Sequence, residues 1–378
     1  MKYLLVILSV IYFSSKPILD RKCIASEKSK EKSHHIRINI NDSILNDLTL
    51  KIKAQYYPNI HSVLIAKNGE LIYEEYFEGT DQNYGKELGI RKFTDTTIQD
   101  VRSVTKSIIA TLVGIAIEKK LIESVDQPIS DFFPEILFTG NKSNWTIEHF
   151  LTMTTGLDWN EKIPYNNPEN DETQMTYSKE PIKYVLNKEL RSEPGKEFNY
   201  SGGATQVLSE IIERTSKMGI EEFAEENLFQ PLEITNYEWN KFSYWGGTEN
   251  FSAASGLRLK PKDMLKLGLL YRNIGVWNGK QLFSNTWVAQ TFEQHIHFES
   301  EFLENDGYGY QFWIWSDKIS EKTVNLKQAN GNGDQNIYID LENDIIIVTT
   351  AGNYNNWNTI ENNSIVMLKK HIYPALLN

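Results

Sequence analysis

The sequence of 378 residues predicts a mixed α/β (α+β) fold, in which a helical insertion interrupts one antiparallel sheet. Residues 61–77 contain two apolar strand-like runs on either side of an Asn68-Gly69 turn, which is the pattern of a β-hairpin. Strand-like runs return near the C-terminus at 309–315, 323–328, 335–341 and 344–350. Because the pattern between these regions is mostly helical, we expect the distant strands to join in one sheet.

Helical periodicity dominates the middle of the chain. The longest apolar helix is expected at 103–120, and Thr146 begins a second helix at 146–151 as its N-cap, with Glu148 in the first turn. Residues 158–175 are rich in Asn and Glu and predict a long polar loop. Further helices are expected at 203–214, 284–294 and 357–376.

The chain divides into four predicted segments. Residues 1–22 are expected to be a signal peptide or N-terminal anchor, because a basic start precedes an apolar run that is too short for a membrane span. This pattern predicts an exported protein of the bacterial periplasm or cell envelope and leaves N-terminal membrane attachment open. The other segments are a polar linker at 23–45, an α/β subdomain at 46–95 and 280–378, and a mainly helical subdomain at 96–279.

Composition limits the partners. Lys and Arg number 39 and Asp and Glu number 50, so the formal charge of −11 argues against binding to nucleic acid or anionic lipid. A small-molecule or short-peptide substrate therefore remains as the expected binding partner. Cys23 is the single cysteine, so no internal disulfide is expected. The histidine clusters lack further ligands at zinc spacing, and no phosphate-binding or dinucleotide motif is present, so neither a metal nor a cofactor is expected.

Ser103-Val104-Thr105-Lys106 opens the long apolar helix and is the first candidate for chemistry. Residues three apart share a helix face, so the Ser103 hydroxyl and the Lys106 amine can meet. A serine needs a neighbouring base before it attacks a carbonyl, and a lysine desolvated by apolar neighbours is such a base. The alternative is an ordinary helix start, with Ser103 as N-cap and Lys106 in solvent.

Two later segments offer the remaining groups for acyl transfer. Tyr200 follows a Pro-Gly turn, and a phenol on such a loop can relay a proton. The alternative is a packed tyrosine with a satisfied hydroxyl. Residues 329–335 end at a predicted strand, where glycines let a carbonyl approach the backbone and an edge N–H can bind an oxyanion. The alternative there is an ordinary hairpin loop.

In this order, the three segments resemble the serine β-lactamase and penicillin-binding-protein family, and within it the class C-type serine hydrolases, which include esterases and amide hydrolases. The resemblance covers about residues 45–375. The flanking stretches that share it are Asp100-Val101-Arg102, Leu151-Thr152-Met153-Thr154-Thr155-Gly156-Leu157, Phe198-Asn199-Tyr200-Ser201-Gly202 and Ala254-Ser255-Gly256-Leu257. It implies a β-lactamase/transpeptidase-like fold, an antiparallel sheet flanked by helices with an all-helical subdomain.

The resemblance also implies a role for each site residue. Ser103 is the nucleophile, Lys106 is its base, and Tyr200 relays a proton and activates the deacylating water. The backbone N–H groups of Ser103 and Gln335 are expected to form the oxyanion hole. Asn332 falls where the family has a lysine or histidine. The substrate-binding segment comprises Asn332, Gly333 and Gln335.

Three positions depart from the family pattern. Gly202 stands two residues after Tyr200, where β-lactamases of this branch have an asparagine. Asn332 is neutral, and Asp334 replaces a glycine and is expected to distort the strand edge. The first two departures argue against an efficient β-lactamase and are similar to esterase and amide-hydrolase relatives.

The expected function is therefore a serine hydrolase that cleaves an ester or amide bond through an acyl-enzyme. One alternative is a β-lactamase or D,D-peptidase acting on peptidoglycan-type substrates. Another is a non-catalytic penicillin-binding-like sensor domain.

Overall fold

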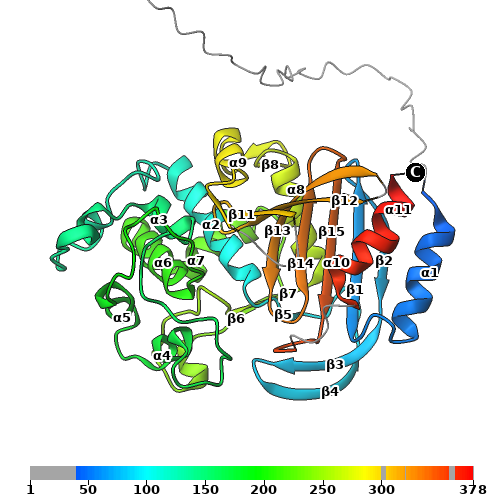
Figure 1. Cartoon of the computed structure of the whole chain (residues 1–378), viewed down its shortest axis with the longest axis horizontal. Helices are drawn as coiled ribbons and strands as arrows, with labels where there is room; N and C mark the ends of the chain where they lie inside the picture. The colour runs from blue at the N-terminus through cyan, green and yellow to red at the C-terminus, as the bar shows by residue number, and fades with distance from the viewer. Residues whose placement is uncertain (1–39, 299–303, 320, 357–361, 378) are drawn as a thin grey trace, which may run out of the picture. The chain divides into compact units, whose positions relative to one another are not determined.

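The computed structural model describes residues 40–298, 304–319, 321–356 and 362–377, all within one compact unit, Asn39–Asn378 (Figure 1). The predicted signal peptide or anchor and most of the predicted linker lie outside the described residues. None of the helices in the described ranges is both long enough and apolar enough to cross a membrane.

The main sheet is antiparallel throughout, with the strand order β10-β11-β12-β13-β14-β15-β1-β2. The N-terminal hairpin joins the C-terminal strands through β1 and β15, as the sequence predicts (Figure 1). The strands are β1 (Ile60–Lys67), β2 (Glu70–Tyr76), β10 (Ile296–His297), β11 (Glu304–Tyr308), β12 (Trp313–Ile319), β13 (Lys322–Gly331), β14 (Gln335–Asp340) and β15 (Ile345–Ala351).

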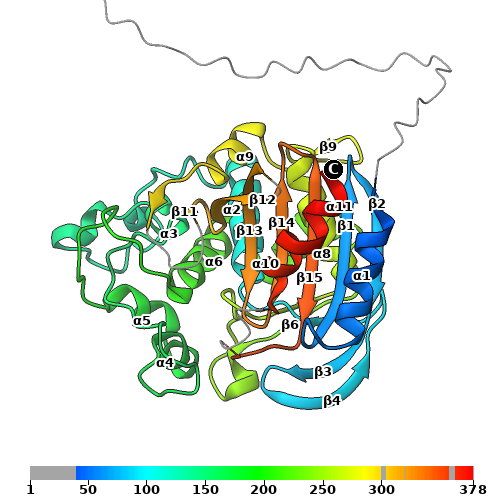
Figure 2. The same cartoon turned by 45° about the vertical axis from the view of Figure 1, so that its right-hand side comes forward.

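Helices cover both faces of this sheet, so its central strands β14 and β15 are buried on both sides. One face carries α1 (Asp42–Lys53), α10 (Ser364–Met367) and α11 (Tyr373–Leu376), and the opposite face carries α2 (Val104–Glu118) and α8 (Pro261–Arg272) (Figure 2). Side chains alternate between the faces along each strand. Leu64 and Val348 therefore pack toward α2 and α8, whereas Val63 and Ile347 pack toward α1.

The helical part packs around α6 (Gly202–Ser216), which contacts α2. Both the sheet and the helical part therefore pack against α2, and residues from both surround its first turn. The other helices are α3 (Ile147–Leu151), α4 (Asp171–Tyr177), α5 (Pro181–Asn187), α7 (Ile220–Ala224) and α9 (Asn285–Thr291). Small sheets accompany them, formed by β3 (Glu78–Asn83) with β4 (Lys86–Lys92), by β5 (Gln99–Asp100), β7 (Leu257–Leu259) and β6 (Glu238–Trp239), and by β8 (Val276–Trp277) with β9 (Lys280–Gln281).

Three predicted elements differ from the structure. Of the helix expected at 357–376, residues 357–361 lie outside the described residues, and the helix begins at Ser364 with α10. The expected loop 158–175 ends in α4, which forms because the Asn170 side chain accepts a hydrogen bond from the Thr173 backbone N–H and caps the helix. The strand expected at 309–315 begins only at Trp313, where β12 starts, and residues 309–312 form a break between β11 and β12. Gly309 lies so close to the Thr291 carbonyl that a Cβ would stand 2.1 Å from it, and Gln311 has φ +60°.

Substitution of Gly268 tests the packing of α8 on the sheet. A Cβ there would lie 2.5 Å from Ile346 Cγ2 and 3.1 Å from Ile337 Cγ2. We expect Gly268→Ala to lower the free energy of unfolding by about 1–3 kcal/mol, because overpacking outweighs the helix propensity of alanine. Urea denaturation measures the change. Gly219→Ala is the control, since a Cβ there meets nothing within 4 Å; equal losses in both variants would contradict the packing argument.

Candidate active site

Ser103 lies at the N-terminal end of α2, directly after Arg102, whose φ of +50° turns the chain into the helix. The Ser103 side chain makes no capping hydrogen bond with the helix. Lys106 lies one turn on and is only 1% exposed. Neither residue therefore has the ordinary helix-start role that the sequence left open.

Lys106 is held by hydrogen bonds that fix its amine beside the serine. Its Nζ donates to Ser103 Oγ at 3.1 Å and to the Ala254 carbonyl at 3.0 Å. Ala254 precedes β7, which pairs with β5 just before Ser103. The spacing of three residues thus brings the hydroxyl and the amine into contact, as the sequence predicts.

Tyr200 completes a cluster around the Ser103 hydroxyl. Its ring centroid lies 4.8 Å from Lys106 Nζ, and its ring stacks on Trp313 at 5.7 Å. Burial raises the pKa of Tyr200 well above 10, the carboxyl of Glu161 adds to this, and the interaction of its hydroxyl with Ser103 opposes it. The neutral phenol is therefore the favoured form, and it is suited to donate a proton.

Only part of the third predicted segment, residues 329–335, lies at the pocket. Asn332 lines the pocket, and two hydrogen bonds hold its side chain to Asn355, each at 2.8 Å. Gly333 packs against the Tyr354 ring, and the buried Gln335 side chain donates to the Gly333 carbonyl at 3.0 Å. Neither Gly333 nor Gln335 lines the pocket. The role of the Gln335 N–H in an oxyanion hole stays a prediction.

Gly331 lies close to the start of α2, and the expected approach of a substrate carbonyl to this segment stays a prediction. A Cβ on Gly331 would lie 3.2 Å from the Ser103 backbone nitrogen and 2.1 Å from the Val101 carbonyl oxygen. Asp334 takes the left-handed backbone of a glycine, with φ +73°, and its carboxylate accepts hydrogen bonds from the Ser364 N–H and hydroxyl. The expected distortion is therefore absorbed by these contacts, because Gln335 still pairs in register with Gly331.

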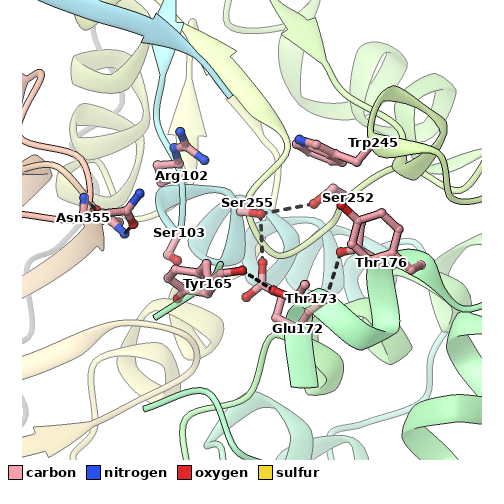
Figure 3. Close-up of a pocket in the computed structure, with 12 residues that line it drawn as sticks. Arg102, Ser103, Tyr165, Glu172, Thr173, Thr176, Trp245, Ser252, Ser255 and Asn355 are labelled. Carbon is pink, nitrogen blue, oxygen red and sulfur yellow. Dashed lines mark hydrogen bonds between the residues drawn. The ribbon is translucent and has the colours of Figure 1, made fainter. Parts of the chain in front are cut away.

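A pocket opens over Ser103 (Figure 3). Arg102 and Asn355 lie on one side of it and Trp245 on the other, while Glu172 and Ser255 point toward each other beside Ser103. Its empty volume is about 740 Å³, including the opening to solvent. The lining residues are Arg102, Ser103, Tyr165, Glu172, Thr173, Thr176, Tyr177, Trp245, Ser252, Ser255, Asn332 and Asn355.

A pair of buried carboxyls, Glu161 and Glu172, lies behind Lys106 and was missed from the sequence. Glu172 Oε2 lies 3.9 Å from Lys106 Nζ, and the two carboxyls hydrogen bond with each other. Burial raises the pKa of Glu161 to about 8, and the neighbouring charge of Glu172 adds to this. Burial also acts to raise the pKa of Glu172, but Lys106 and the hydrogen bond from Glu161 outweigh it, so that pKa lies below its usual value.

The missed carboxyls lie in the segment that the sequence predicts to be a solvated loop. The Asn170 cap is a sequence signal for the helix that carries Glu172, but it does not indicate the burial of either carboxyl. Among the described residues, no three His, Cys, Asp or Glu side chains gather as a metal site would require.

A serine in contact with a buried lysine and next to a tyrosine, at the edge of a pocket, is the arrangement expected of a serine hydrolase. The chain belongs to the beta-lactamase family, whose model, described as Beta-lactamase, matches residues 61–367. Membership implies a serine hydrolase, and the antiparallel sheet with flanking helices is the fold expected from the resemblance.

Similar proteins support the family without fixing the substrate. Protein flp of Staphylococcus aureus (strain NCTC 8325 / PS 47) is 24% identical over 190 residues, which cover 48% of this chain and 35% of that protein. The fold is similar to that of EstCE1, described as a hydrolase with promiscuous acyltransferase activity, with a TM-score of 0.68 and 17% identity over 89% of this chain and 98% of that chain. It is also similar to the octameric penicillin-binding protein homologue from Pyrococcus abyssi, with a TM-score of 0.66 and 19% identity over 89% of this chain and 79% of that chain.

Substitution of Gly331 tests whether β13 must touch the nucleophile. We expect Gly331→Ala to slow modification of Ser103 by a fluorophosphonate about 100-fold, because a displacement of about 1 Å in an active site has an effect of that size. Labelling followed over time and resolved by peptide mass spectrometry measures the rate. The control is again Gly219→Ala, and a Gly331→Ala rate equal to that of the control would show that the contact is not needed.

Proposed function

We propose that the protein hydrolyses an ester or amide bond through an acyl-enzyme formed on Ser103. The observation that carries this proposal is the contact of one hydroxyl with two proton-transfer groups. Ser103 Oγ accepts a hydrogen bond from Lys106 at 3.1 Å, and Tyr200 lies beside both, with its ring 4.8 Å from Lys106 Nζ and its hydroxyl interacting with Ser103. This arrangement of nucleophile, base and acid is the one that acyl transfer requires.

Acylation begins when Lys106 takes the Ser103 proton and Ser103 Oγ bonds to the substrate carbonyl carbon. The Ser103 N–H at the start of α2 stabilises the oxyanion, with a second N–H from the adjacent 331–335 hairpin, which includes the predicted Gln335. Tyr200 protonates the leaving amine or alkoxide as its bond to carbon breaks, and the Lys106 ammonium returns a proton to Tyr200.

Deacylation runs through the same groups. Tyr200 passes its phenol proton to neutral Lys106 and accepts a proton from water as the water oxygen bonds to the acyl carbon. The bond from that carbon to Ser103 Oγ then breaks, and the Lys106 ammonium returns its proton to Ser103. The acid product leaves, and every group is restored to its starting form.

The third predicted segment of the site, residues 329–335, favours ester or amide substrates over β-lactams. Asn332 carries no charge and is bonded to Asn355, so it offers no cation to a β-lactam carboxylate. The pocket has a cation in Arg102, but an ion pair with Asp100 at 3.1 Å already engages it.

Removal of the nucleophile tests the proposal. Ser103→Ala is expected to abolish labelling by a fluorophosphonate probe, and Lys106→Ala to lower the labelling rate roughly 10²–10⁴-fold, because one proton-transfer group contributes about that much. Gel fluorescence measures labelling, and circular dichroism checks the fold. Ser143→Ala, at an exposed serine, is the control and should label normally. Undiminished labelling of Ser103→Ala would refute the assignment.

A substrate panel separates the alternatives. We expect repeated turnover of short p-nitrophenyl acyl esters or simple amides and slow or absent turnover of nitrocefin, because Asn332 is neutral. Release of nitrophenol and the change in nitrocefin absorbance measure this. Rapid nitrocefin turnover would favour a β-lactamase, cleavage of D-alanyl-D-alanine peptides a D,D-peptidase, and one persistent acyl group per chain a sensor domain.

A further inference from the structure

The space two residues after Tyr200 is filled from another part of the chain. Gly202 has no side chain, and a Cβ built on it would lie 2.6 Å from Glu172 Oε2 and 3.1 Å from Ala254 Cβ. An asparagine is expected at this position in the β-lactamases that the sequence resembles. The carboxylate of Glu172, carried by α4, therefore stands where the side chain of residue 202 would otherwise begin.

Glu172 is tied to the groups that hold Lys106. Its Oε1 accepts a hydrogen bond from Ser255 Oγ at 3.0 Å, and Ser255 directly follows Ala254, whose carbonyl accepts from Lys106 (Figure 3). Its Oε2 faces Lys106 Nζ at 3.9 Å. The amine of Lys106 thus lies between the Ser103 hydroxyl and one carboxylate.

Glu161 supports this carboxylate from behind. Its Oε2 accepts from the Gly202 N–H at 2.6 Å and from Trp159 Nε1 at 2.7 Å, and its Oε1 accepts from the Tyr165 hydroxyl at 3.2 Å. Two carboxyls in hydrogen-bond contact resist double ionisation, and the raised pKa of Glu161 places the shared proton on that residue. The pair then carries one negative charge, on Glu172, beside Lys106.

We propose that the Glu161–Glu172 pair is the third member of the site, with Glu172 positioning Lys106 and stabilising the ammonium that forms when Lys106 takes the Ser103 proton. The inference rests on the proposed function. The arrangement corresponds to that of a catalytic triad, in which a base activates the nucleophile and an acidic side chain orients that base. Glu172 contacts no reacting atom in this scheme, so it is a positioning residue, and Glu161 is the neutral donor that keeps its charge in place.

Isosteric amides of the two acids separate charge from shape. Glu172→Gln removes the charge beside Lys106 and is expected to lower kcat for a p-nitrophenyl ester about 100-fold with a smaller change in KM. Glu161→Gln keeps an N–H donor toward Glu172, so its loss of kcat is expected to be at least tenfold smaller. Glu169→Gln, an exposed acid in the same segment, is the control and should match wild type.

The pH profile distinguishes this role from a purely structural one. Above a pH of about 8 Glu161 ionises and can no longer donate to Glu172, so the position of the Glu172 carboxylate is no longer held and kcat of the wild type is expected to fall there. Glu161→Gln cannot ionise and should lose this fall. The other titratable groups facing the pair are Lys106, Tyr165, Tyr200 and Arg102, and all are unchanged in this variant.

A residue exchange tests the shared space. Gly202→Asn alone should impair activity, because its side chain overlaps Glu172, and Glu172→Ala alone should impair it by loss of the charge. The double variant is expected to be at least tenfold more active than Glu172→Ala, since the asparagine oxygen can enter the vacated space near Lys106. Thermal unfolding of each variant confirms that activities are compared between folded proteins.

The outcomes also separate this inference from the proposed function. Failure of the wild type to acylate Ser103 would remove the proposed function before any variant is compared. Acylation of the wild type together with a normal kcat and pH profile in Glu172→Gln would overturn the role of the pair alone. The double variant could instead lose as much activity as the sum of the losses in Gly202→Asn and Glu172→Ala. That result would overturn the role of the pair as well.

Discussion

The hydrogen bond from Lys106 Nζ to Ser103 Oγ is the interaction on which the remaining structure of the site depends. It requires α2 to begin at Ser103 and to run directly into the buried layer, where both the sheet and α6 contact it. The apolar residues that follow Lys106 give α2 no polar face, so the helix is stable only when it is enclosed on all sides. The same enclosure keeps the amine of Lys106 away from bulk water and beside the serine.

Hydrogen bonds fix the start of α2 against β7. Val101 N–H donates to the Leu257 carbonyl at 3.0 Å, and Leu257 N–H donates to Thr105 Oγ1 at 3.2 Å, so the start of α2 is bonded to β7 on both sides of Ser103. Gly331 packs against the same turn without a side chain. These contacts bring distant stretches of sequence together around Ser103.

The parts of the site that depend on local spacing were predictable from the sequence. Ser103 and Lys106 share a helix face because they lie three residues apart, and Tyr200 was indicated by the Pro-Gly turn before it. The sheet followed from the apolar strand-like runs near the two ends of the chain. The sequence did not show which of Gly331 and Gly333 lies against the start of α2. That depends on which of the two glycines faces Val101 in the folded chain. Glu161 and Glu172 were missed because their burial is created by Trp159, Tyr165 and the absent side chain of Gly202, and none of these relations is visible as a pattern. Export and the subdomain boundaries stay predictions.

The most direct measurement of the central claim is an acid quench during the first turnover of a p-nitrophenyl ester, followed by peptide mass spectrometry. The account predicts a burst of about one nitrophenol per chain and one acyl group on the peptide that contains Ser103, with the group lost as turnover continues. Turnover without any acylated peptide, or with the acyl group on a different residue, would contradict it.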